Sequence, residues 1–521
     1  MGRLLGGLLF LALAVAVFLR GPFLDARPMH NDEAVNAVKF GKLWEHGGYR
    51  YDANEHHGPL LYYAALAVGR LTGAPADLEH YSDPRLRAVT VLFGLGLILL
   101  LPLLTDGLGR AASMWAALWL AVSPAFVFYS RYFIHEILLV FFTLLALGAG
   151  WRYWRSRRLG WALVAGAALG LMDATKETFV ITLGAAGVAL ILNQCWNRVL
   201  DASGRPVRAR RLNPWHLAAG LGVWFVVAVA LFSSFFTNGS GPLDSLRSYQ
   251  PWLHRAGGAS PHLHPWYFYL HRLAWFHAAK GPVWTEGLIL VLAMAGGVAG
   301  FRRQSLASAN ASFVRFLALY TFLLTTFYSL LAYKTPWCLL NFWLGAILLA
   351  GVGAAVVVRS LKRPVWARVA AGLLLVGAGH LAWQAWQQDT LYAADRRNPY
   401  VYAQTSPDIL ELVTRIEQLA EVSPEGRALL IKAIDPQGDF WPLPWYLRSF
   451  RQIGWWEEMP KDPFAPVMIV SARLRAGLDE NKTHLMTRYY QLRPDAFFEL
   501  YVQVDLWKAF LAKHPLQQES E

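Results

Sequence analysis

Two adjacent carboxylates, Asp32 and Glu33, follow the first apolar stretch of the chain, in the segment PMHNDEAVNA. If that stretch crosses a bilayer, both side chains stand at a membrane surface, where partial desolvation raises the proton affinity of a carboxylate. Such a carboxylate can act as a general base. Asp32 could instead cap the amphipathic helix that the following apolar spacing predicts, which would contribute about 1 kcal/mol. The residues alone leave both interpretations open.

Three basic residues lie in short turns between apolar runs. They are Arg131 in SRYFIHE, Lys176 in DATKET and Lys334 in AYKTP. A cation at headgroup depth is costly unless it meets a partner, and an anionic lipid phosphate is one such partner. Snorkelling toward lipid headgroups would also explain Arg131 and Lys334. A local ion pair with Glu177 or Asp173 would explain Lys176.

Two further polar segments carry groups that could bind a substrate or a metal. The segment NEHHGPLLYY contains Glu55, His56 and His57, and SRYFIHE contains His135 and Glu136. Two histidines and a carboxylate could ligate a divalent ion, although adjacent histidines rarely coordinate one ion together. Hydrogen bonds to a substrate or to the loop are the alternative. Glu136 could orient a substrate or cap the helix that begins there.

The elements that must position these residues are apolar helices. The chain has 521 residues, of which 55% are hydrophobic and 16% charged, a balance too apolar for a soluble protein of this length. We predict an all-α polytopic membrane protein with about eleven transmembrane helices, each long enough to cross about 30 Å of hydrocarbon. The apolar runs lie at about residues 4–20, 87–104, 111–129, 136–151, 159–173, 178–195, 215–235, 286–300, 313–332, 337–357 and 367–386.

Basic clusters predict the orientation of these spans. If the spans alternate, the clusters at 152–158, 197–211, 301–304 and 359–368 share one side, which should be cytoplasmic. This topology explains the net charge of +13 better than nucleic-acid binding does. The N-terminus is then cytoplasmic in a plasma or inner membrane, and the polar motifs share the outer face. A signal peptide is the other reading of residues 1–20, but no small-residue cleavage site follows them.

Composition divides the chain after residue 386. We predict a membrane domain over residues 1–386, with a long first outer loop at 21–86 and an aromatic outer loop at 236–285. Residues 387–521 contain a helical segment and two apolar runs, RALLIKAI and APVMIVSARL, that read as buried strands. This part is predicted to be a soluble α/β domain, and an odd number of spans places it outside the cell.

The polar motifs, in their order along the chain, resemble those of the GT-C glycosyltransferases. That order is a first transmembrane helix, the Asp-Glu pair, HGPLLYY before the second span, SRYFIHE, ATKET and YKTPW. Protein O-mannosyltransferases and lipid A aminoarabinose transferases belong to this group. The chain is most similar to the prokaryotic family of flippase-activity-associated proteins. The resemblance covers roughly residues 1–345.

The resemblance implies a membrane enzyme that transfers a hexose or pentose from a polyprenyl-phosphate donor to an unidentified acceptor on the outer face, with inversion. It implies that Asp32 is the base that takes the proton of the acceptor hydroxyl. Glu33 and Glu136 would orient the acceptor or a divalent metal ion. The donor phosphate would be held by Arg131, Lys176 and Lys334, and the donor or a metal would lie near Glu55, His56 and His57.

Two other classes of function stay open. One is a flippase for lipid-linked sugars, or a flippase accessory protein. Transport usually needs broken or polar helices at the midplane, whereas the ionisable residues here collect at one predicted face. The other is a catalytically inactive scaffold that presents its C-terminal domain to partners. The sequence has no recognisable Rossmann glycine fingerprint, which disfavours a nucleotide-sugar donor.

Overall fold

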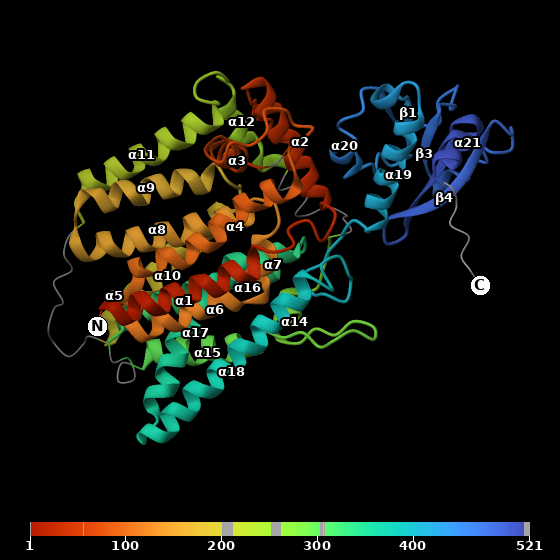
Figure 1. Ribbon diagram of the computed structural model, residues 1–521. Helices are drawn as coiled ribbons and strands as arrows, with labels where there is room; N and C mark the ends of the chain where they lie inside the picture. The colour runs from red at the N-terminus through yellow and green to blue at the C-terminus, as the bar shows by residue number, and fades with distance from the viewer. Residues whose placement is uncertain are drawn as a thin grey trace. The chain divides into compact units, whose positions relative to one another are not determined.

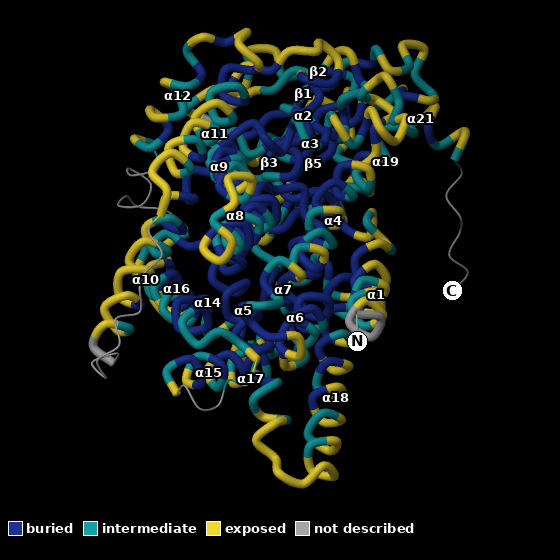
Figure 2. Tube along the Cα trace, turned by 90° about the vertical axis from the view of Figure 1, so that its left-hand side faces the viewer, coloured by how far each residue is buried: buried dark blue, intermediate teal, exposed yellow. Residues whose placement is uncertain are grey.

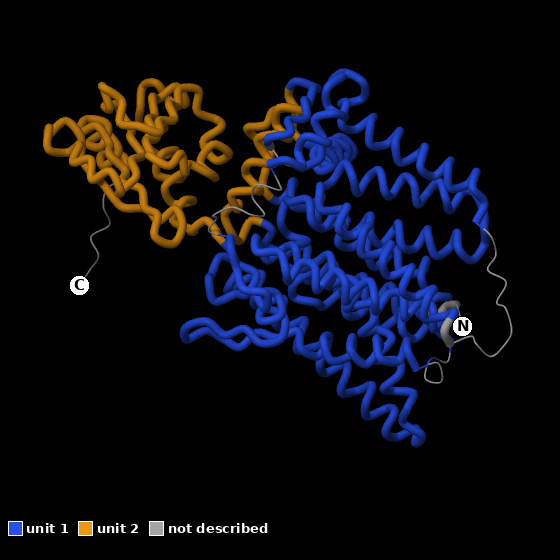
Figure 3. The backbone as a smooth tube through the Cα atoms, turned by 180° about the vertical axis from the view of Figure 1, so that it is seen from behind, with its two compact units in different colours: residues 1–24, 46–74, 84–402 blue, residues 25–45, 75–83, 403–521 orange. Residues whose placement is uncertain are grey.

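The computed structural model describes residues 2–55, 57–200, 212–251, 262–302, 306 and 308–514. The chain divides into two compact units, which Figure 3 shows in different colours. Unit 1 comprises residues 1–24, 46–74 and 84–402, and unit 2 comprises residues 25–45, 75–83 and 403–521. Two stretches of the predicted first outer loop therefore fold with the C-terminal part of the chain. The compositional boundary after residue 386 falls inside unit 1.

The apolar runs predicted from the sequence are all helical (Figure 1). They form α1 (Gly2–Arg20), α4 (Asp83–Leu100), α6 (Arg110–Val122), α7 (Pro124–Ser130), α8 (Glu136–Ser156), α9 (Leu159–Asp173), α10 (Phe179–Leu200), α11 (Pro214–Phe232), α15 (Gly287–Phe301), α16 (Ala311–Leu330), α17 (Leu340–Ser360) and α18 (Pro364–Asp389). The prediction of a mainly helical membrane protein is confirmed.

The number of spans is smaller than the predicted eleven. Within the described residues, seven helices are long and apolar enough to cross a bilayer, and an eighth counts if α6 and α7 form one span despite a 57° bend. The bend falls at Pro124, which cannot continue the helical hydrogen-bond pattern. Helices α9 and α15 are each 15 residues long, whereas a spanning helix needs about 20. The predicted number is wrong because apolar composition alone does not fix helix length.

Helix α17 forms the centre of unit 1. In its most apolar stretch 78% of the residues are buried, whereas the corresponding share is 17% in α11 and in α18. Figure 2 colours the chain by this burial. Two glycines allow α15 to approach α17 closely. A Cβ at Gly353 would lie 1.9 Å from the carbonyl oxygen of Leu292, and one at Gly296 would lie 2.0 Å from that of Leu349. Small residues at such a crossing are typical of helices that associate in membranes.

The C-terminal part of unit 2 is a mixed α/β fold, as predicted. Its five-stranded sheet has the order β2-β1-β3-β5-β4, with β1 parallel to β2 and β3 and with β5 antiparallel to β3 and β4. The strands are β1 (Ile431–Ile434), β2 (Ile453–Trp456), β3 (Val467–Ser471), β4 (His484–Arg493) and β5 (Ala496–Gln503). Helices α19 (Asp408–Val422) and α21 (Val504–Lys513) supply apolar side chains to the larger core. Both predicted strands, β1 and β3, are confirmed.

Shorter helices flank the polar motifs. They are α2 (Asn31–His46), η1 (Ala53–Glu55), α3 (Leu60–Leu71), η2 (Leu101–Leu104), α5 (Thr105–Leu108), α12 (Gly241–Arg247), α14 (Phe268–Ala274), η4 (Pro336–Leu339), η5 (Gly426–Ala428), α20 (Leu443–Tyr446) and η6 (Ala472–Leu474). Helix α2 is the amphipathic helix expected after the carboxylate pair. It lies in unit 2, whereas α3, α12 and α14 lie in unit 1.

Candidate active site

The N-terminus of α2 is capped by His30 and Glu33. Nδ1 of His30 accepts a hydrogen bond from the backbone N–H of Asp32 at 3.1 Å, and the Glu33 carboxylate accepts one from the backbone N–H of His30 at 3.0 Å. The bond from Glu33 back to the N-cap residue is that of a capping box, whereas His30 caps the N–H of the second helical residue. Burial lowers the pKa of His30, which favours the neutral ring that can accept at Nδ1. The cap that the sequence offered as an alternative role for Asp32 is therefore made by its neighbours.

Glu33 is fully buried and holds the loop together. Its Oε2 lies 2.5 Å from Nη1 of Arg27, and both side chains are shielded from solvent. An ion pair in such surroundings depends on both partners, because a single remaining charge would be uncompensated. The sequence assigned Glu33 a contact with acceptor or metal, but its oxygens bind Arg27 and the His30 N–H.

The Asp32 carboxylate, unlike that of Glu33, has no partner among the described residues. Its side chain is half-buried, and within the described part of the chain its carboxylate accepts no hydrogen bond and forms no ion pair. The N-terminal end of a helix favours negative charge. Asp32 is therefore a fixed carboxylate whose oxygens are available to an external ligand.

In unit 1, the motifs HHGPLLYY and ATKET are joined through their backbones. Residues His57 and Lys176 form an antiparallel bridge, and the N–H of Gly58 donates to the carbonyl of Thr175 at 3.1 Å. A Cβ at position 58 would lie 2.1 Å from the carbonyl oxygen of Ala174. Only glycine fits this approach, which explains why it stands between the histidines and the proline.

The side chains of these motifs form one ion pair and one contact between a histidine and a carboxylate. Lys176 binds the carboxylate of Glu136, and both are buried. Nδ1 of His57 lies 3.0 Å from Oε2 of Glu177. Burial disfavours the charged form of Lys176, but the Glu136 carboxylate outweighs this and raises the pKa of Lys176 above its usual value. The ion pair expected for Lys176 exists, with a partner 40 residues away in sequence rather than a local one.

Arg131 holds the end of α1. Its guanidinium donates to the carbonyls of Pro22 at 2.6 Å and Phe23 at 2.7 Å, and its Nε lies 3.2 Å from Oδ1 of Asp389. The side chain is buried. Neither snorkelling nor phosphate binding is needed to explain Arg131, because Asp389 neutralises its charge.

Lys334 has no counter-charge among the described residues. Its Nζ donates to the carbonyls of Leu331 and of His264, the latter at 2.9 Å. Among the residues that the structure describes, no carboxylate lies within ion-pair distance of it. Burial lowers the pKa of Lys334. The lysine is thus surrounded by neutral acceptors, and an anion could bind beside it.

Arg272, on α14, is a second cation of this kind that sequence reasoning missed. Its guanidinium stacks on Phe268 at 3.6 Å from the ring centre, and no carboxylate in the described ranges pairs with it. Burial, followed by the charges of Arg272, His262 and Lys334, lowers the pKa of His264 to about 4. His264 therefore lies near both Arg272 and Lys334. The signal in the sequence was a basic residue within an aromatic loop, HPWYFYLHRL, that contains no acid.

The predicted metal site is not assembled from described residues. His56 and the side chain of Glu55 lie outside the part of the chain that the structure describes. Among the described side chains, no group of three or more histidines, cysteines or carboxylates could hold a metal ion. A divalent ion near His57 stays a prediction.

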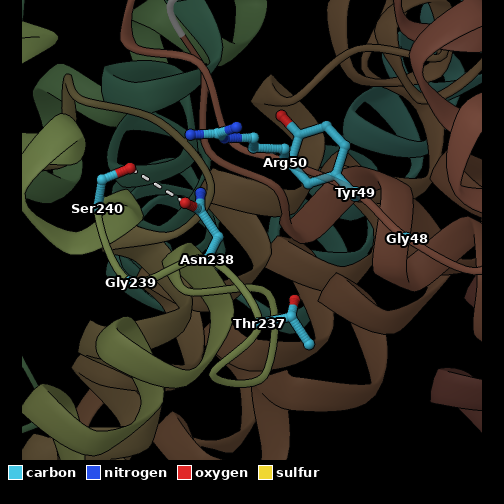
Figure 4. A pocket seen from close by; sticks show the side chains of 7 residues that line it. All are labelled: Gly48, Tyr49, Arg50, Thr237, Asn238, Gly239 and Ser240. Atoms are coloured by element: carbon cyan, nitrogen blue, oxygen red, sulfur yellow. Dashed lines mark hydrogen bonds between the residues drawn. The ribbon is translucent and has the colours of Figure 1, made fainter.

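A polar pocket of about 520 Å³ lies between residues 48–50 and 237–240 of unit 1 (Figure 4). Arg50 is the one charged residue of its lining. The Oδ1 of Asn238 accepts a hydrogen bond from Ser240 at 3.1 Å, while its buried Nδ2 has no partner within the described residues. The lining thus offers hydrogen-bond donors that suit oxygen acceptors such as sugar hydroxyls.

Comparisons with known proteins agree on the fold. A family model for dolichyl-phosphate-mannose-protein mannosyltransferase matches residues 73–240. The structure of ArnT from Cupriavidus metallidurans bound to undecaprenyl phosphate is 17% identical, with a TM-score of 0.60 over 96% of this chain and 99% of that one. ArnT in the apo state gives 15% and a TM-score of 0.62 over the same shares.

A third structure is more distant. The Archaeoglobus fulgidus oligosaccharyltransferase, in complex with Zn and sulfate, is 14% identical, with a TM-score of 0.53 over 95% of this chain and 73% of that one. A search of curated proteins gives no match. The chain shares the fold of these three structures, as the resemblance to the GT-C glycosyltransferases implies.

Proposed function

We propose that this protein is a membrane glycosyltransferase that transfers one sugar, a hexose or a pentose, from a polyprenyl-phosphate donor to an acceptor hydroxyl. The observation that carries the proposal is Asp32, a half-buried carboxylate without a protein partner among the described residues. Its neighbours His30 and Glu33 supply the helix cap instead. The shared fold supports a lipid-linked donor, since ArnT has been crystallised with undecaprenyl phosphate.

In the proposed reaction, Asp32 takes the proton of the acceptor hydroxyl while the hydroxyl oxygen attacks the anomeric carbon of the donor. The bond from that carbon to the phosphate oxygen breaks, and the polyprenyl phosphate leaves with the electron pair. Direct displacement inverts the configuration at the anomeric carbon. A positioned general base contributes about 10²- to 10⁴-fold to such a step. Glu33 acts indirectly, through the loop that carries Asp32.

The donor phosphate, in this proposal, is bound by Lys334 and Arg272. Both cations lack a carboxylate partner among the described residues, whereas Arg131 and Lys176 are neutralised by Asp389 and Glu136. Fixed cations stabilise the charge that develops on a leaving phosphate. Lys176 and Arg131 thus support the structure around the site rather than contacting the donor.

Substituting Lys334 by Ala is expected to lower kcat/KM for the lipid donor about tenfold or more, because a hydrogen bond to a charged group is worth about 1.5–3 kcal/mol. Arg272→Ala should have a similar effect. Steady-state transfer kinetics with a labelled donor check this. Lys280→Ala is the control, since Lys280 is an exposed lysine in the segment that follows α14. Equal kinetics in all three variants would contradict the assignment.

The proposed topology follows the charges of the loops. We place the N-terminus in the cytoplasm of a plasma or inner membrane, residues 387–521 outside, and the polar motifs on the outer face. A divalent metal near Glu55, His56 and His57 belongs to the same proposal. The acceptor is an outer-face hydroxyl compound.

The experiment that tests the function uses purified protein in liposomes with radiolabelled sugar on polyprenyl phosphate. The expected result is cleavage of the donor and labelled acceptor product by the wild-type protein but not by Asp32→Asn. The alternative of a flippase or flippase accessory protein predicts the opposite pattern. In that case intact labelled lipid would cross the bilayer equally well with both proteins, and no donor would be cleaved.

A further inference from the structure

The C-terminal residues of unit 2 bind the peptide that precedes Asp32. The hydroxyl of Tyr446 accepts a hydrogen bond from the backbone N–H of Met29 at 2.7 Å, and the hydroxyl of Thr405 donates to the carbonyl of Met29 at 2.8 Å. The side-chain amide of Gln404 donates to the carbonyl of Pro28 at 3.2 Å. These partners are 376 to 417 residues apart in sequence. The backbone just before α2 is therefore fixed by the C-terminal domain.

The same C-terminal segment also holds the far end of the first loop. The Tyr446 hydroxyl donates to Oδ2 of Asp83 at 2.7 Å, and Nε1 of Trp445 donates to Oδ1 of Asp83 at 2.7 Å. Arg448 stacks on Trp445 at 3.8 Å from the ring and donates to the carbonyls of residues 78, 79 and 81. Trp445 is fully buried. Helix α20 and Arg448 thus bind both segments of the first loop in unit 2, residues 25–45 and 75–83, and we call these contacts the clamp.

Tyr446 is the centre of this clamp. Its hydroxyl accepts from Met29 and donates to Asp83, so both hydrogen-bonding functions of the phenol are used. Polar chains of this kind rigidify a structure when every member is satisfied. Met29 is buried, and it stands three residues before Asp32.

We infer that the C-terminal domain positions the catalytic carboxylate, with Tyr446 and Thr405 as the positioning residues that act through Met29. The inference rests on the proposed role of Asp32. A base must be held close to its productive geometry, since a misplacement of about 1 Å can cost about 10²-fold in rate. The domain is thus part of the catalytic apparatus, in addition to any contact it makes with an acceptor.

The test compares Tyr446→Phe and Thr405→Val with two matched controls. Tyr501→Phe removes a hydroxyl that donates to Glu499 at 2.7 Å inside the sheet, and Thr414→Val removes one that donates to the Leu410 carbonyl at 2.8 Å. We expect kcat to fall about tenfold in the first pair, with KM for the donor unchanged, and to stay at the wild-type value in the controls. Equal kcat values in all four variants, or equal losses, would overturn the inference.

A second measurement separates this inference from the proposed function. Hydrogen–deuterium exchange of the backbone at residues 27–34 should be faster in Tyr446→Phe than in wild type, and unchanged in Tyr501→Phe. This readout needs no transferase activity, so it decides the clamp even if the wild-type protein transfers no sugar. Unchanged exchange at residues 27–34 in Tyr446→Phe would overturn the clamp. If the wild-type protein transferred sugar from none of the donors, the proposed function would be overturned instead.

Discussion

Replacing Asp32 by Asn is expected to lower kcat for sugar transfer by about 10²- to 10⁴-fold while the protein stays folded. Asparagine has nearly the same shape but cannot take the acceptor proton. The Asp32 carboxylate has no protein partner in the described part of the chain, so its removal leaves no group of the fold unpaired. Transfer assays and thermal unfolding in detergent measure the two effects on the same preparations.

Glu33→Gln, one residue away, is the matched comparison. Glu33 is fully buried against Arg27, and breaking such a pair leaves an uncompensated charge that typically costs about 3–5 kcal/mol. The expected result is a lower unfolding temperature, with any loss of activity following the loss of folded protein. If Asp32→Asn kept wild-type kcat, the general-base assignment would fail, whatever the outcome for Glu33→Gln.

The sequence predicts the membrane helices well but not their packing. Apolar runs identify each helix because a bilayer selects for composition, which is readable residue by residue. Whether a run spans depends on its exact ends, and the bend at Pro124 and the short helix α9 both reduce the predicted number. The close contact between Gly296 and Gly353 could not be predicted, since each glycine is meaningful only beside its partner helix.

In the candidate site too, local features were predictable from the sequence and long-range contacts were not. The sequence singles out these residues because a charge in a turn between apolar spans is costly unless it has a partner. Which partner it has is a long-range property. Asp389 neutralises Arg131 and Glu136 neutralises Lys176, while Lys334 meets only carbonyls among the described residues. The local sequence around the three cations does not distinguish the paired ones from Lys334.

The role of the C-terminal domain is the clearest case of missing information. Two of its five strands, β1 and β3, were predictable from apolar runs, but nothing local indicates that Thr405 binds Met29. Residues 25–45 and 75–83 look like a loop of the membrane domain by position in the chain, yet they fold with residues 403–521. Hydrogen bonds to backbone groups leave little trace in side-chain composition, since every residue type can supply the carbonyl and every type except proline the N–H.

Breaking the ion pair between Glu136 and Lys176 is expected to have the second large effect, a loss of stability. Glu136→Gln is expected to lower the free energy of unfolding by about 3–5 kcal/mol, because Lys176 would stay buried without its counter-charge. Thermal unfolding in detergent measures the loss. Asp244→Asn is the control, since its pair with Arg247 at 2.9 Å is on the surface, and surface pairs contribute about 1 kcal/mol or less.

A double variant separates structure from chemistry at this pair. Glu136→Leu combined with Lys176→Met replaces the buried charges with apolar groups, an exchange that is often neutral or stabilising. The unfolding temperature should therefore return close to that of wild type. If Lys334 and Arg272 bind the donor phosphate, the double variant should also keep most of its kcat/KM for the donor. Recovered stability with lost transfer would contradict this and would show that Glu136 or Lys176 contacts a substrate.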